Sequence, residues 1–379
     1  MGSEWINNLE ARRRVTDILR QAGIPLELRV ASECQKFCHE NDGPKAPSLR
    51  SNKVIYAPLD DSDTYREVDQ VVHIHEEFPI GAHTGIQLIG SVPIECKHRH
   101  DVEYFAFPVE DIAAYEGFPV WSRLAGSQLF RSLRKTYSGL QKFVPSVASM
   151  VEIRDGQTPS SLFKENLLHN SIASLYDFVL AEIGPTPLLG DTFDKEDWEK
   201  TDSFTKFQRY LKKNRYAWWA VLRDQISAIP LNDCRQFNKA VCKERIFFGM
   251  QFELPIICVD GPIYLVSSNQ SFEIKDYSEV DSCLLSIRKQ KWPGNARFAL
   301  LRRTAEVPAV LTNPKGLRSA LEVAFAWHRE IHNALVNADP ILVERWPLET
   351  ALYSRVLEHY EAREPLLSYR SDINIEESL

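Results

Sequence analysis

A carboxylate and an ammonium group stand two positions apart in the apolar segment Val92-Pro93-Ile94-Glu95-Cys96-Lys97. Side chains of a β-strand alternate between its two faces, so Glu95 and Lys97 share one face. Val92, Ile94 and Cys96 then point the other way, towards a core. Burying a charge without a partner costs a large desolvation energy, so this pair needs polar neighbours. The segment therefore predicts a strand that presents charged side chains to a site.

A second carboxylate precedes this segment on a predicted strand over residues 65–75. Val68, Val72 and Ile74 share one face of that strand, and Asp69 lies on the opposite face. If the two strands are neighbours, Asp69 and Glu95 converge. Two converging carboxylates repel unless a cation lies between them, and Mg²⁺ prefers such oxygen ligands. With Lys97 beside them to orient a water or stabilise phosphate charge, the set suits metal-assisted phosphodiester hydrolysis.

An apolar strand ending in Glu95-Cys96-Lys97, after a strand that carries Glu67-Val68-Asp69, resembles the PD-(D/E)xK nuclease superfamily. The resemblance implies a restriction-endonuclease-like fold, an α/β or α+β mixed sheet flanked by helices. It also implies that Asp69, Glu95 and the Cys96 carbonyl bind Mg²⁺ or Mn²⁺, that Lys97 acts on the attacking water, and that Glu10 is a supporting acid. Val68 replaces the proline that names the motif.

The function that this resemblance implies is a metal-dependent deoxyribonuclease acting in restriction, phage defence or a mobile element. DNA would be its substrate, and a homodimer or an accessory protein is allowed. A different class of function also fits, namely a catalytically inactive subunit that keeps the nuclease-like fold and binds nucleic acid or assembles a complex. The two hypotheses differ in one structural expectation: Asp69 and Glu95 converge in the nuclease and fail to converge in the inactive subunit.

Histidines suggest a third reading. His73 and His75 lie on one strand, and His98 and His100 follow the Glu95 strand. Pairs spaced two apart share a strand face, and imidazoles are ligands for Zn²⁺ or Fe²⁺. A His-rich metalloprotein with another hydrolytic activity is the corresponding hypothesis. By contrast, His328 and His332 on a later helix lack the His-Glu-x-x-His order of zinc proteases, and we expect both on a helix surface.

Basic residues that could contact phosphates cluster with aromatic residues in one predicted helical stretch. They are Lys206, Arg209, Lys212, Lys213 and Arg215. The whole chain of 379 residues carries a net charge of −7, so nucleic-acid binding would need a local basic surface of this kind. The alternative is a solvated helix face with core tryptophans.

Composition and missing motifs limit the cellular compartment, the partners and the cofactors that we expect. Seven cysteines without a regular framework are typical of reduced thiols in a cytoplasmic protein. The sequence has no apolar stretch of the roughly 20 residues that span a bilayer, so we expect no membrane partner. Walker-type and dinucleotide-binding glycine motifs are also missing, which argues against nucleotide-driven chemistry.

The elements needed to position the site are a first helix over 5–22, strands over 25–30, 54–57, 65–75 and 91–99, and returning strands over 246–266. The chain then divides into an N-terminal part of the core (1–118), a helical insertion or lobe (119–245), returning strands (246–270), a C-terminal helical region (271–367) and a polar tail (368–379). The strand at 254–259 is the expected last strand of the core.

Overall fold

The computed structural model describes residues 9–21, 23–43, 46–56, 65–79, 84–98, 105–108, 129, 132–133, 144, 147–149, 175, 229–241, 246–268, 274–286 and 309–348. Its helices are α2 (Leu9–Gln21), α3 (Ile24–Glu40), α9 (Leu231–Val241) and α11 (Leu317–Val336). Its strands are β1 (Ser48–Tyr56), β2 (Arg66–Pro79), β3 (Thr84–Lys97), β4 (Phe105–Pro108), β5 (Val147–Ser149), β6 (Ile246–Glu253), β7 (Ile256–Val259), β8 (Ile263–Ser268), β9 (Ile274–Val280), β10 (Ser282–Ser286) and β11 (Ala309–Thr312).

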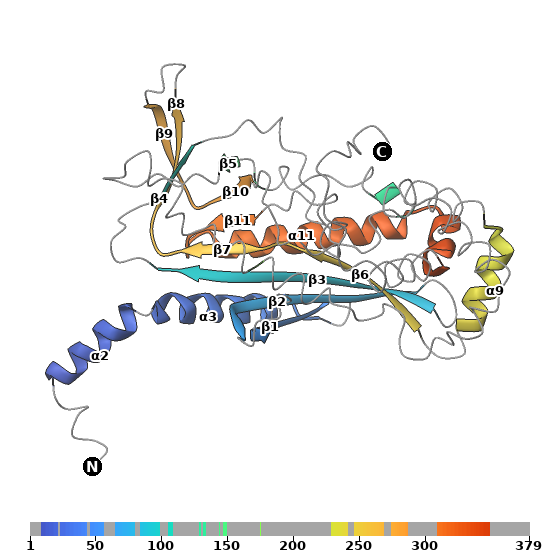
Figure 1. Ribbon diagram of the computed structural model, residues 1–379, viewed down its shortest axis with the longest axis horizontal. Coiled ribbons are helices and arrows are strands. Elements are labelled where there is room, and N and C mark those ends of the chain that lie inside the picture. The colour runs from blue at the N-terminus through green and yellow to red at the C-terminus, as the bar shows by residue number, and fades with distance from the viewer. Residues whose placement is uncertain are drawn as a thin grey trace, which may run out of the picture.

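Eight of the described strands form one mixed sheet in the order β1-β2-β3-β7-β11-β10-β5, with β6 also paired to β3 (Figure 1). β1, β2 and β3 are antiparallel neighbours, whereas β7 joins β3 in parallel. The first part of β3 pairs with β6 and its last part pairs with β7. A second sheet contains β4, β8 and β9. The protein is therefore a mixed α/β structure, as expected from the sequence.

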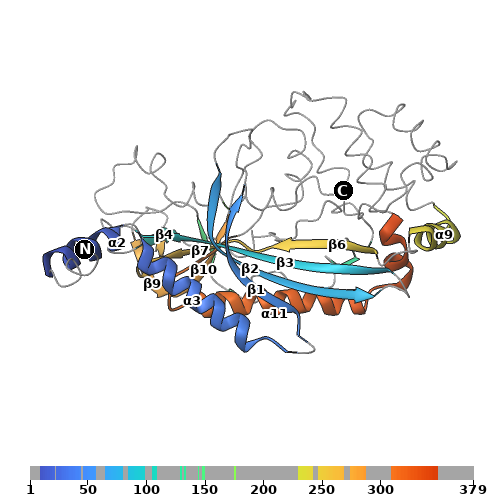
Figure 2. The same cartoon turned by 90° about the horizontal axis from the view of Figure 1, so that it is seen from below.

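Two helices, α3 and α11, lie on one face of the large sheet (Figure 2). Leu26, Val30 and Phe37 of α3 belong to the same buried cluster as Val92 and Ile94 of β3. Cys96 is partly buried and packs against this cluster too. The predicted orientation of Val92, Ile94 and Cys96 towards a core is thus confirmed, which leaves the opposite face for Glu95 and Lys97.

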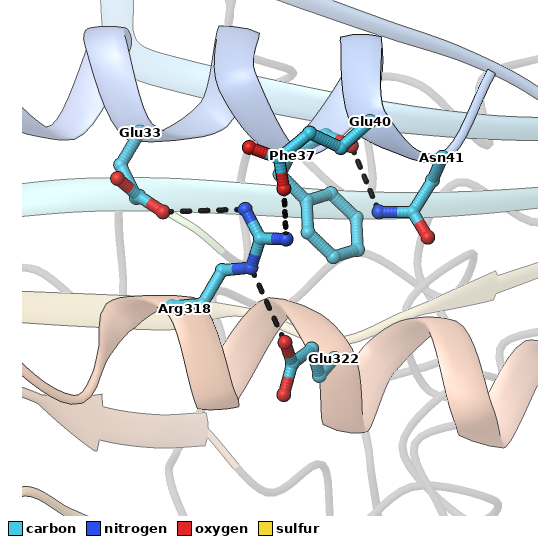
Figure 3. Close-up of polar contacts among 6 residues, drawn as sticks. All are labelled: Glu33, Phe37, Glu40, Asn41, Arg318 and Glu322. Atoms are coloured by element: carbon cyan, nitrogen blue, oxygen red, sulfur yellow. Dashed lines mark hydrogen bonds and ion pairs between the residues drawn. The ribbon is translucent and has the colours of Figure 1, made fainter.

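An arginine links the two helices that cover the sheet (Figure 3). Arg318 of α11 donates hydrogen bonds to Glu33 and Glu40 of α3 and to Glu322 on its own helix. Its guanidinium carbon also lies 5.3 Å from the ring centroid of Phe37. Partly exposed ion pairs contribute little individually, but a shared guanidinium fixes how α3 sits along α11.

The turn before α11 depends on a glycine for close packing. A Cβ atom added to Gly316 would lie 2.4 Å from the carbonyl oxygen of Asp281 and 2.7 Å from Oγ1 of Thr312. The same Asp281 carbonyl accepts hydrogen bonds from the hydroxyl of Thr312 and the N–H of Asn313. A side chain at position 316 would therefore separate α11 from the turn that precedes β10.

Several predicted elements differ from those observed. Residues 25–30 were expected as a strand but belong to α3, because Leu26, Val30, Cys34 and Phe37 are spaced to bury one helix face. Pro25 is compatible with this assignment because it lies in the first turn. β1 begins at Ser48 rather than at 54, and β3 begins at Thr84 rather than at 91.

The expected C-terminal helical region, 271–367, contains β9, β10 and β11 as well as α11. The helix predicted over 5–22 is confirmed as α2, and the later helix that carries His328 and His332 is α11. Most of the proposed helical lobe, 119–245, and the whole tail, 368–379, lie outside the described residues.

Candidate active site

The two carboxylates expected to converge lie on adjacent strands. β2 pairs with β3 as far as Gln70 opposite Ile94, and Asp69 and Glu95 are the next residues along the two strands. Oδ2 of Asp69 accepts a hydrogen bond of 2.7 Å from the main-chain N–H of Cys96. The fold therefore brings Asp69 to the middle of the Glu95-Cys96-Lys97 segment.

Glu95 is largely buried and is paired with Lys97. The lysine Nζ donates a hydrogen bond of 2.6 Å to Oε1 of Glu95. The second oxygen, Oε2, is buried and has no hydrogen-bond partner among the described residues. A buried carboxylate oxygen without a donor is costly, so this atom is a candidate ligand for a cation.

Burial sets the electrostatics of both acids. It raises the pKa of Glu95 to about 6, with Asp69 adding to the increase and Lys97 opposing it. Burial also raises the pKa of Asp69, while the Cys96 N–H and Lys97 act in the opposite direction. Asp69 is thus close enough to disfavour the charged form of Glu95, and a bound cation would favour that form.

A third acid and a second lysine adjoin this pair, and neither was identified from the sequence. Glu27 of α3 raises the pKa of both Asp69 and Glu95. Nζ of Lys53, on β1, lies 3.4 Å from Glu27 and 2.6 Å from Glu67. Glu27 was not predicted as a site residue because its segment, 25–30, alternates like a strand. As part of helix α3, the same segment places Glu27 beside the sheet.

Glu10, the acid expected to support the site, lies on a different helix. It belongs to α2, where it forms an exposed i,i+4 ion pair of 2.6 Å with Arg14. Its side chain is 72% exposed. The structure does not bring Glu10 to Asp69 and Glu95, because the first predicted helix precedes the helix that packs on the sheet. Glu27 of α3 is the acid whose charge acts on both of these carboxyl groups.

Cys96 contributes its main chain rather than its thiol. Burial raises the pKa of the Cys96 thiol well above its usual range, so the sulfur stays protonated at neutral pH. The side chain packs on the core face, away from Glu95 and Lys97. Any ligand role for this residue would therefore fall to its carbonyl oxygen, as the resemblance implies.

At the same end of β3, a smaller polar cluster lies beside the carboxylates. Asp260 directly follows β7, and Nδ1 of His98 lies 2.9 Å from its Oδ2. Arg29 of α3 donates a hydrogen bond of 2.9 Å to Oδ1 of the same aspartate. These contacts span 162 and 231 residues of sequence, so no local pattern signalled them.

The three described histidines between residues 73 and 98 do not gather at one point. His73 pairs with Ser91 and His75 with Gln87, both towards the middle of the sheet, whereas His98 contacts Asp260. His83 and His100 lie outside the described residues. Within the described part of the chain, no group of three or more His, Cys, Asp or Glu side chains is arranged to bind a metal ion.

His328 was expected on a helix surface, and this expectation is wrong. Its side chain is fully buried between α11 and the sheet, with Nδ1 3.8 Å from Oε2 of Glu76. His332, one turn later, lies 3.5 Å from the other oxygen of Glu76. Burial lowers the pKa of His328 to about 3, so this imidazole is neutral in the folded protein.

The predicted phosphate-binding residues, Lys206, Arg209, Lys212, Lys213 and Arg215, lie outside the described residues. Among the helices that are described, none is both long and apolar enough to cross a membrane. Comparison with known proteins finds no matching family model, no matching curated protein and no matching solved structure.

Proposed function

We propose that this protein is a metal-dependent deoxyribonuclease of the PD-(D/E)xK type. The observation that carries the proposal is the placement of Asp69 and Glu95 on neighbouring strands, with Lys97 bonded to Glu95. Two carboxylates and a lysine in this arrangement are the groups that metal-assisted phosphodiester hydrolysis needs.

The arrangement of elements supports the same proposal. The superfamily core implied by the sequence resemblance runs helix, three strands, helix, strand. Here α3 precedes the antiparallel strands β1, β2 and β3, and β7 joins β3 in parallel next to the candidate site. A restriction-endonuclease-like fold is therefore our proposal for this part of the chain.

The residues present suit a divalent cation with oxygen ligands. Oε2 of Glu95 is buried without a donor, and the carboxylate of Asp69 lies next to it. Three carboxylates, Glu27, Asp69 and Glu95, lie within electrostatic range here, and Lys53 and Lys97 are the two lysines that oppose them. This excess of negative charge favours a cation. Asp69, Glu95 and the Cys96 carbonyl would hold Mg²⁺ or Mn²⁺, which would supply positive charge to the phosphate oxygens.

The chain's own groups then have distinct roles in hydrolysis. The oxygen of a water molecule forms a bond to phosphorus, the bond to the leaving oxygen breaks, and that oxygen takes up a proton. Lys97 is held by Glu95, so its ammonium group can orient the water or stabilise the charge that develops on the phosphate. The hydrogen bond from the Cys96 N–H keeps Asp69 directed at the same point.

A second candidate function is a catalytically inactive subunit that binds nucleic acid or assembles a complex. One observation favours it: among the described residues no three ligand side chains are arranged to bind a metal ion. In that case the Glu95–Lys97 ion pair would be a structural contact, and the protein would bind DNA without cleaving it.

The test is incubation of the purified protein with linear and circular DNA, with Mg²⁺ or with EDTA. We expect cleavage by the wild type with Mg²⁺, loss of cleavage in EDTA, and a loss of at least 100-fold in Lys97→Ala. Lys36→Ala, which changes an exposed lysine of α3, is the matched control and should cut normally. DNA binding without cleavage by a folded wild type would support the inactive subunit instead.

A further inference from the structure

Asp260 connects three elements at one end of the sheet. Its main-chain N–H donates a hydrogen bond of 3.1 Å to the carbonyl oxygen of Lys97. Its carboxylate contacts His98, the residue after Lys97, and Arg29 of α3. Both carboxylate oxygens are therefore engaged, one by the end of β3 and one by a helix.

Lys97 lies at the end of its strand, where contacts from outside the strand are needed to hold its main chain in place. Lys97 is the last residue of β3, and strand ends open more readily than strand centres. Its neighbour in the sheet, Val259, is likewise the last residue of β7. A lysine that acts on a water molecule must hold its position within a fraction of an ångström. Asp260 and its contacts, just beyond both strand ends, would supply that constraint. We call Asp260 with His98 and Arg29 the anchor.

The start of α3 lies against the same anchor. Gly23, which caps the helix with a φ of 75°, is so placed that an added Cβ would lie 3.4 Å from Cβ of His98. The carboxyl ends of β3 and β7 and the first turns of α3 meet at this end of the molecule (Figure 1). Glu27, which influences both Asp69 and Glu95, belongs to the same turns.

We propose that Asp260 is a positioning residue that fixes the main chain of Lys97 and docks the start of α3, acting through His98 and Arg29. The inference rests on the proposed function, because it is Lys97 that would act on the substrate. Asp260 itself would contact neither the phosphate nor the metal. By fixing the position of Asp260, the side-chain contacts keep the main-chain N–H of Asp260 directed at the carbonyl oxygen of Lys97.

One consequence is measurable without any substrate. Hydrogen exchange of the amides of residues 94–98 should be at least tenfold faster in Asp260→Ala than in the wild type, while amides in the middle of β3 keep their protection. The double variant Arg29→Ala, His98→Ala should reproduce this change, because it removes both partners of the carboxylate. Asp276→Ala, at an exposed position of β9, is the matched control and should exchange normally.

The second consequence concerns DNA cleavage. In Asp260→Ala, kcat should fall about 10- to 100-fold while KM for DNA changes less than twofold, because binding surfaces are intact and only Lys97 is misplaced. Asp260→Asn keeps one acceptor oxygen and should be intermediate in both measurements. If Asp260→Ala loses protection throughout the protein, Asp260→Asn provides the comparison.

The outcomes separate the two proposals. Normal exchange at residues 94–98 in Asp260→Ala, or normal cleavage by that variant beside an active wild type, would overturn the positioning role alone. A wild type that cuts no DNA, combined with faster exchange in Asp260→Ala, would overturn the nuclease and leave the anchor as a structural fact. Faster local exchange together with a fall in kcat alone would support both.

Discussion

The main-chain N–H of Cys96 donates a 2.7 Å hydrogen bond to Oδ2 of Asp69, across the boundary between β2 and β3. This contact directs Asp69 at the segment that carries Glu95 and Lys97. A hydrogen bond to a carboxylate favours its charged form, yet burial has the larger effect and the pKa of Asp69 is raised. Burial therefore disfavours the charged forms of both carboxyl groups, and a bound cation would favour them.

Neutralising Glu95 should therefore stabilise the metal-free protein. The pKa of Glu95 is raised to about 6 in the folded protein, so the folded state loses stability as the pH rises from the ordinary pKa of a glutamate through 6. Above pH 6 the full energetic cost of the buried charge remains. In EDTA at pH 7.5, Glu95→Gln should raise the free energy of unfolding by about 1–2 kcal/mol. The gain should vanish near pH 4, where Glu95 is already protonated.

Urea denaturation followed by circular dichroism would measure this difference. Glu322→Gln is the control, because Glu322 is an exposed partner of Arg318 and its loss should change stability by less than about 0.5 kcal/mol. A Glu95→Gln variant that is less stable than the wild type at pH 7.5 would mean that the Lys97 ion pair outweighs the desolvation of Glu95.

The supporting acid should be Glu27 rather than Glu10. Glu27 acts electrostatically on both site carboxylates, whereas Glu10 is paired with Arg14 on the exposed surface of α2. If the protein cleaves DNA, Glu27→Gln should raise the Mg²⁺ concentration for half-maximal cleavage about 3- to 10-fold, because it removes negative charge beside the cation. Glu10→Gln should leave that concentration unchanged. The reverse result would place the supporting acid on α2.

The parts of the site that the sequence could predict are those set by a local period. Alternation along β2 and β3 indicated which residues face the core, and it placed Glu95 and Lys97 together on the other face. The pairing of β2 with β3 followed from their order in the chain. The strand predicted at 254–259 is also confirmed, as β7, and it pairs with β3.

The parts that could not be predicted depend on tertiary contacts. The segment Pro25-Leu26-Glu27-Leu28-Arg29-Val30 alternates like a strand, but packing of Leu26 and Val30 on the sheet makes it helical and brings Glu27 to the site. Asp260 meets its partners across 162 and 231 residues. His328 is a different case, because it has the spacing of the buried face of α11, four residues after Ala324 and three before Ile331, and only its polar side chain suggested exposure.

Gly316 should be hard to replace even by alanine. The added Cβ would stand 2.4 Å from a main-chain oxygen, which cannot move as a side chain can. Gly316→Ala should therefore lower the free energy of unfolding by about 1–3 kcal/mol, the usual cost of overpacking. Gly43→Ala is the matched control, since its nearest neighbour would be 3.9 Å away. Equal stability of the two variants in urea would show that the turn at Asp281 yields to the extra methyl group.

The buried His328 should make the fold sensitive to mild acid. Its pKa is about 3 in the folded protein because of burial, with His332 lowering it further, against about 6.5 in an unfolded chain. In this pH range His328 binds a proton in the unfolded state but not in the folded state. The free energy of unfolding therefore falls as the pH drops from 6.5 towards 3. Between pH 6.5 and 5 this single group should cost about 2 kcal/mol.

Stability curves of wild type and His328→Leu isolate that contribution from the many carboxyl groups that titrate below pH 5. The free energy of unfolding of the variant should fall less steeply over pH 6.5 to 5, whatever its absolute value at pH 7. His39→Asn, at an exposed position in the last turn of α3, should follow the wild-type curve. Parallel curves for wild type and His328→Leu would mean that Glu76, 3.8 Å from the imidazole, compensates the charge when His328 is protonated.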